Sequence, residues 1–146
     1  MKRTYDYYRI GYEKLKLYNI LEDVRMRKKE FLYAKSHEWV QFLDETTARI
    51  GISDYAQDQL GDLVFINLPE VGDELVAGEE FADVESVKAV SNVYSPVTGT
   101  VRAINEDLLD HPELVNSDAT DAWFVEVEDI RDQSELLSEE DYKAQL

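Results

Sequence analysis

The chain has 146 residues, a mass of 16.9 kDa and a formal net charge of −17 at pH 7. This length predicts one domain, and 44% hydrophobic residues suffice for one modest core. No stretch approaches the length of a membrane-spanning helix. The lack of cysteine excludes disulfides, thiolate metal sites and a cysteine nucleophile.

The charge is distributed unevenly along the chain. Residues 1–30 hold nine Lys and Arg against five Asp and Glu, a net of +4, whereas residues 31–146 hold six against twenty-seven, a net of −21. Because nucleic acids are polyanions, so acidic a body argues against binding them. An acidic surface can steer basic partners, or it can simply keep the protein in solution.

Residues 1–30 differ from the rest and are interpreted as an N-terminal extension. Apolar side chains recur there every three or four residues, which favours a helix that Gly11 weakens; they are Tyr8, Tyr12, Leu15, Tyr18 and Leu21. The composition matches neither a secretory signal nor a transit peptide. Our hypothesis is that Met26 is the natural start and that the upstream residues are an extension or a cloning remnant.

The remaining chain predicts short strands punctuated by turns. Residues 39–43 and 46–50 flank Asp44-Glu45 as a hairpin, and Ser53 is a good N-cap for a short helix over 54–60 that Gly61 ends. Further strands are predicted at 63–66, 74–77, 81–87, 90–94, 100–104 and 123–127. Ser138 caps a closing helix that continues to Leu146. Turn residues every 8–12 positions favour a mostly β sandwich or barrel.

One predicted hairpin places Lys88 at or beside its tip, between the strands 81–87 and 90–94. Its turn contains neither Asn-Gly nor Asp-Gly, so the tightest hairpin types are not indicated. Lysine is rare in the acidic body, where Lys35 and Lys143 are the others. Position alone leaves two interpretations open: a solvated turn residue, or an amine held out for acylation.

Several stretches resemble the glycine cleavage system H proteins. Glu85–Ala89 followed by Ser91–Gly99 resembles the lipoylation segment of that family. The agreement continues through Ser36–Val40, Gly51–Gln57, Leu60–Ile66, Leu68–Gly72, Pro112–Asn116 and Trp123. It covers about residues 32–146 in order, which makes it more specific than one motif. The loop 118–122 departs from the family pattern because it has no glycine.

The resemblance implies a fold and a set of site residues. The fold would be a flattened barrel-sandwich hybrid over residues 31–146, with short helices and the lysine hairpin at one end. Lys88 would carry a covalent lipoate, and Glu85 would be recognised by the modifying enzyme. Ser36, Glu38 and Asn92 would line a cleft that shelters the loaded arm. Since Asn92 is neutral where the family often has an acid, Glu38 is the expected charged contact.

The implied function is that of a carrier and not an enzyme. The arm would take the aminomethyl group of glycine from a pyridoxal-phosphate decarboxylase (P protein) to a folate-dependent aminomethyltransferase (T protein). Dihydrolipoyl dehydrogenase (L protein) would then reoxidise it, and a lipoate ligase or an octanoyl or lipoyl transferase would attach it. A monomer is expected in a bacterial-type cytoplasm, in preference to a mitochondrial matrix, without nucleic-acid or membrane partners.

Four alternatives remain. A lipoate-relay protein of the same fold would donate lipoyl groups to other enzymes. A biotin carrier would have methionine on both sides of the lysine, and a 2-oxoacid dehydrogenase lipoyl domain would have aspartate before it; here the neighbours are Val87 and Ala89. The last is an acidic structural domain with an unmodified lysine. His37 and His111 do not have metal-site spacing, so neither a metal ligand nor a catalytic residue is assigned.

Overall fold

The computed structural model describes residues 11, 13–17, 19 and 30–146, and the chain divides into two units, residues 1–30 and 31–146. In the first unit, residues 11, 13–17 and 19 are helical. The rest of the predicted helical pattern and the hypothesis on Met26 lie outside the described residues.

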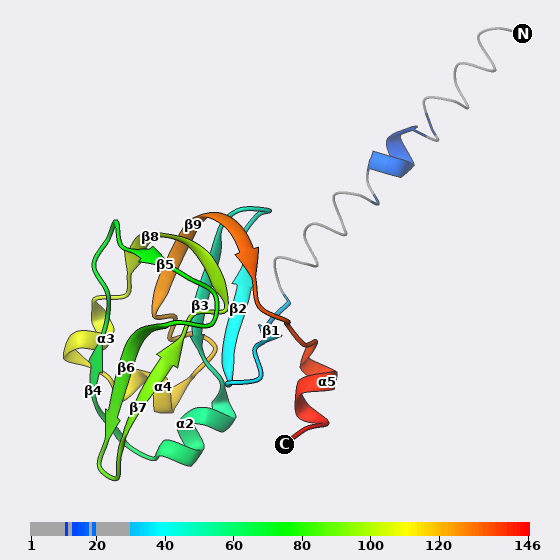
Figure 1. Cartoon of the computed structure of the whole chain (residues 1–146). Helices are drawn as coiled ribbons and strands as arrows, with labels where there is room; N and C mark the ends of the chain where they lie inside the picture. Colours follow the sequence, from blue (N-terminus) through cyan, green and yellow to red (C-terminus); the bar gives the residue numbers. More distant parts are fainter. Residues whose placement is uncertain (1–10, 12, 18, 20–29) are drawn as a thin grey trace, which may run out of the picture. The chain divides into compact units, whose positions relative to one another are not determined.

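The second unit is built from two antiparallel sheets (Figure 1). The larger has the strand order β1-β2-β3-β9-β8-β5, with bounds Leu32–Tyr33, Glu38–Phe42, Ala48–Ile52, Val125–Gln133, Val97–Ile104 and Glu74–Leu75. The smaller has the order β4-β6-β7, with bounds Leu63–Asn67, Glu80–Ser86 and Val90–Tyr94. The mostly β prediction is therefore confirmed.

Both sheets contribute to one buried cluster, which makes the unit a sandwich. Buried residues alternate with less buried ones along β6, β8 and the first half of β9, as expected for strands with one solvated face. The cluster joins Val40, Ile50, Val101 and Val127 of the larger sheet to Ile66, Val84 and Val93 of the smaller. Val84 and Val93 anchor β6 and β7 to this core, and the connection between the two strands lies at one end of the smaller sheet (Figure 1).

Short helices complete the unit: α2 Asp54–Leu60, α3 Asp107–Asp110, α4 Leu114–Ser117 and α5 Glu139–Lys143. The prediction for α2 is confirmed at both ends, since Ser53 Oγ accepts from Ala56 N at 3.1 Å and Gly61 has φ +81°. The sequence did not predict α3 and α4, which are four residues long and lack a capping side-chain hydrogen bond. The closing helix α5 was predicted too long, because it ends at Lys143.

Two strands also extend beyond their predictions. β8 begins at Val97, and β9 starts at Val125 and continues to Gln133. The charged segment of β9 has no apolar alternation, so periodicity alone would end the strand early. It stays extended because it pairs with β8, with Thr98 opposite Asp132 and Val97 opposite Gln133.

Candidate functional site at the lysine hairpin

The β6–β7 hairpin carries Lys88 at its turn, and the Lys88 side chain is exposed. Ser86 N donates to Ala89 O at 2.8 Å, so Val87 and Lys88 are the two connecting residues. Among the described non-glycine residues, positive φ occurs at His37 and Asp129 and at neither turn residue. The turn therefore lacks the backbone geometry that best matches twisted hairpin strands, and other contacts must hold it.

Those contacts come from the main chain and one hydroxyl group. Ser86 Oγ accepts from the backbone N–H of Lys88 and of Ala89, both at 3.1 Å. A serine hydroxyl used in this way replaces part of the missing turn chemistry. Val87 N also donates to Asp62 O at 3.1 Å, which ties the tip to the loop after α2. The position of Lys88 is thus set without using its own side chain.

Asn116 holds that loop in place. Its Nδ2 donates to Gln57 Oε1 at 2.8 Å and to Gly61 O at 3.0 Å, and its Oδ1 accepts from Leu63 N at 3.0 Å. One side chain at the end of α4 thereby joins the end of α2 to the start of β4. Its partners are at least 53 residues away in the sequence, so no local signal reveals this role.

Replacing Asn116 with alanine should therefore destabilise the fold by about 2 kcal/mol, because three partly buried hydrogen bonds are lost. Urea unfolding measures this loss. Native-state hydrogen exchange should also show the Val87 amide opening faster, since its acceptor belongs to the released loop. Asn67→Ala, which removes one exposed hydrogen bond to Asp83, should leave both quantities nearly unchanged. Unaltered exchange at Val87 in the Asn116 variant would show that the hydrogen bonds of Asn116 do not hold the loop that contacts the hairpin tip.

A second group of predicted site residues lies at the start of β2. The Glu38 side chain is buried, with 3% of the residue exposed, and it accepts from Ser36 Oγ and from Tyr94 N, the latter at 3.4 Å. Burial raises the pKa of Glu38 to about 7, and the hydrogen bonds from Ser36 and Tyr94 oppose that increase. Glu38 therefore holds a carboxyl group that changes charge close to neutral pH.

The structure brings Ser36 and Glu38 into contact but does not join Asn92 to them. Asn92 lies on the exposed side of β7, and its Nδ2 donates to Glu80 Oε1 at 2.9 Å. Ser36 and Tyr94 also line a hollow of about 260 Å³. Of the three cleft residues expected from the sequence, two form a pair and the third has another partner.

His37, between Ser36 and Glu38, has a structural role. Its backbone has φ +80°, and its Nδ1 lies 2.6 Å from Tyr142 Oη, which in turn lies 2.7 Å from Ser53 Oγ. Burial lowers the pKa of His37, so the neutral imidazole is favoured. The exposed His111 pairs with Glu113 at 3.1 Å. Within the described residues, no group of three or more His, Cys, Asp or Glu side chains could hold a metal ion.

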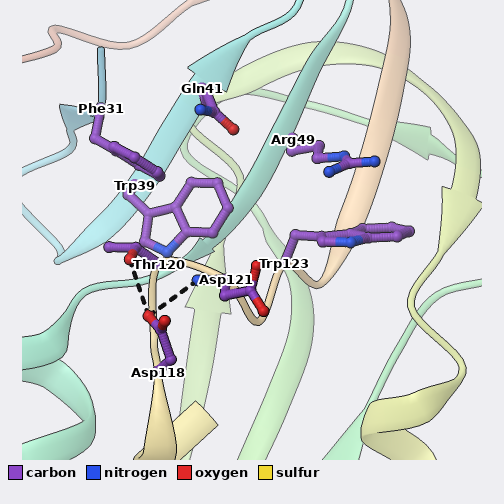
Figure 2. Close-up of a pocket in the computed structure, with 8 residues that line it drawn as sticks. All are labelled: Phe31, Trp39, Gln41, Arg49, Asp118, Thr120, Asp121 and Trp123. Carbon is purple, nitrogen blue, oxygen red and sulfur yellow. Dashed lines mark hydrogen bonds between the residues drawn. The ribbon is translucent and has the colours of Figure 1, made fainter. Parts of the chain in front are cut away.

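Another hollow, of about 300 Å³, lies beside the loop that has no glycine (Figure 2). Asp118 Oδ1 accepts from Thr120 Oγ1 at 3.0 Å and from Asp121 N at 3.3 Å, while Trp39 Nε1 donates to Ala119 O at 3.0 Å. The loop is thus closed by an aspartate turn and by the core. None of the site residues predicted from the sequence lines this hollow.

A β-sandwich that displays an exposed lysine on a braced hairpin has the architecture of a carrier domain. The family model for the glycine cleavage H-protein matches residues 31–146. The H protein of Lachnoclostridium phytofermentans is 61% identical over 112 residues, which are 77% of this chain and 88% of that protein. That of Listeria monocytogenes is 50% identical over 121 residues, 81% of this chain and 96% of that protein.

A solved structure agrees with these sequence matches. The crystal structure of a glycine cleavage system H protein from Mycobacterium marinum superposes with a TM-score of 0.74 at 34% identity, and the match covers 80% of this chain and 95% of that one. The chain belongs to the glycine cleavage H-protein family and is a lipoyl carrier, not a catalyst, of the glycine cleavage system. None of its described helices is long and apolar enough to cross a membrane.

Proposed function

We propose that Lys88 Nζ bears the lipoyl group through an amide bond. The observation that supports this most directly is an exposed lysine on a turn held by main-chain contacts. The side chain also has space: it runs past Gly61, where a Cβ would come within 3.2 Å of Lys88 Cε. When bound, the lipoyl group supplies the disulfide that accepts the aminomethyl group and is later reoxidised.

Ser36 and Glu38 are the proposed hydrogen-bond acceptors for the protonated amine that the loaded lipoyl arm carries. A carboxylate and a hydroxyl are suitable partners for an ammonium group, and the burial of Glu38 keeps water from competing. An ammonium group nearby would lower the pKa of Glu38 from about 7. Amine binding would then release a proton from Glu38 at slightly acidic pH. Asn92 is the weaker third candidate, because its amide is engaged with Glu80.

The proposed partners are the other components of the system. They are a pyridoxal-phosphate glycine decarboxylase, a folate-dependent aminomethyltransferase, dihydrolipoyl dehydrogenase and the enzyme that attaches lipoate. With a net charge of −21 over residues 31–146, this unit would be steered toward partner surfaces that carry basic side chains. The relatives above come from bacteria, so we propose that the protein acts in a bacterial-type cytoplasm.

The test of attachment is intact mass after expression in a host that makes lipoate. The wild-type protein should gain the mass of one lipoyl group, and Lys88→Arg should lose that gain completely while unfolding at the same temperature, because the side chain is exposed. Lys35→Arg, another exposed lysine, is the matched control and should still be modified. A Lys88→Arg protein that still gains the mass of a lipoyl group would refute attachment at Lys88.

A reconstituted mixture separates glycine cleavage from lipoate relay. Lipoylated protein with the three partner enzymes, glycine, tetrahydrofolate and NAD+ as the electron acceptor should release carbon dioxide from glycine. A protein that passes its lipoyl group to other carriers but supports no decarboxylation would establish the relay function instead.

A further inference from the structure

The outer face of the smaller sheet carries two exposed apolar side chains on either side of a glutamate, next to the hairpin tip. Strand pairing places Phe65 opposite Glu85 and Glu85 opposite Val90. Residues directly opposite in antiparallel strands share a face, and all three are exposed. We call Phe65, Glu85 and Val90 the tip row, because these residues lie across all three strands, next to the turn residues Val87 and Lys88.

The apolar character of this face is concentrated at the tip. Phe65 is 59% exposed, Val90 65% and Val87 68%. The next row away from the tip is polar, since Asn67 pairs with Asp83 and Asp83 with Asn92. An exposed aromatic and aliphatic cluster with a polar border is typical of a surface that contacts another protein.

We propose that the tip row is the docking surface for the enzyme that acylates Lys88, with Phe65 and Val90 as apolar contacts on either side of the Glu85 carboxylate. This inference rests on the proposed modification of Lys88. On the partner enzyme we expect a pocket for the Phe65 ring and a basic side chain that faces Glu85. The basic side chain is expected because Asp62 and Asp83, at the edge of the tip row, add to the negative charge of Glu85.

The chemistry of attachment selects this partner over the others. Nζ in its neutral form attacks the carbonyl carbon of an acyl adenylate; the N–C bond forms, the bond from that carbon to the phosphate oxygen breaks, and AMP leaves with the electron pair. The amine gives up its extra proton to the enzyme or to water. The active site must therefore reach Nζ itself and cover the neighbouring side chains. Enzymes that act on the finished arm need only reach its distant sulfur atoms.

The experiment compares attachment with a later step in the same variants. Phe65→Ser and Val90→Ser apoproteins are incubated with a bacterial lipoate–protein ligase, lipoate and ATP, and kcat/KM is measured with respect to the carrier. The same variants, fully lipoylated by long incubation with excess ligase, are then reduced by dihydrolipoyl dehydrogenase with NADH. Val71→Ser is the matched control, since Val71 is 62% exposed and lies outside the tip row.

Attachment to Phe65→Ser should slow about tenfold or more, as for an aromatic residue that contributes strongly to an interface, with a smaller loss for Val90→Ser. Reduction of the arm and the thermal unfolding temperature should not change. Equal attachment rates in all variants would overturn the inference, as would an equal loss in both reactions. Loss of a dimer in sedimentation would instead make the row a contact between copies. A wild-type protein that no ligase modifies would refute the proposed function itself.

Discussion

Gly51→Ala should reduce the free energy of unfolding by about 3 kcal/mol, the upper range for overpacking a core. Gly51 on β3 lies opposite Trp39 on β2, and an added Cβ would sit 2.6 Å from two indole carbons and 2.8 Å from Nε1. The ring has little room to retreat, because Trp39 is 1% exposed and its Nε1 donates to Ala119 O. Urea unfolding followed by tryptophan fluorescence measures the loss.

A double-mutant cycle tests the cause. In a Trp39→Val background the obstructing ring is absent, so adding Gly51→Ala should cost far less than in the wild-type protein. Trp39→Val is itself strongly destabilising because it leaves a cavity, and the cycle corrects for that. Additive effects of the two substitutions would show that the glycine is required for another reason.

The second large effect is a fall in stability as the pH rises, caused by Glu38. Its folded-state pKa of about 7 lies above the ordinary glutamate value of 4.5. Between these values the unfolded chain releases a proton that the folded protein keeps, so stability decreases with increasing pH and levels off above about 7. A difference of this size corresponds to about 3 kcal/mol over that interval.

The variant Glu38→Gln isolates this contribution, because it cannot ionise. Relative to the wild type, its free energy of unfolding should rise steadily from pH 4 to pH 8 by about 3 kcal/mol, measured by urea unfolding at constant ionic strength. Glu79→Gln, at an exposed position, is the control for the substitution. A pH-independent difference between Glu38→Gln and the wild type would show that the carboxyl group is not held protonated.

If Glu38 binds the amine, the same variant should also release a loaded aminomethyl group faster.

The elements that could be predicted from the sequence are those with local signals. The hairpin of β2 and β3 follows from its strand-forming residues, and α2 follows from Ser53 and Gly61, which cap it. The helices α3 and α4 carry no capping side-chain bond, and the second half of β9 is extended because β8 pairs with it. Such features depend on tertiary contacts that no short window of sequence contains.

The site divides in the same way. The exposed tip position of Lys88 follows from two strand-forming runs and the turn between them. The buried state of Glu38 does not follow from its neighbours, since one of its donors, Tyr94 N, is 56 residues away. The bracing of the tip by Asn116 and Asp62 was also missed, because both contacts join segments far apart in the chain.

The tether between Val87 N and Asp62 O has a consequence for how this protein can diverge. Since backbone groups and the Ser86 hydroxyl set the turn, the architecture places little demand on which side chains occupy positions 87 and 89. Substitutions at positions 87 and 89 should therefore affect enzymes that recognise the loop more than they affect folding. Under the proposed attachment at Lys88, the preference of the ligase could therefore change, or be redesigned, while the fold of residues 31–146 stays the same.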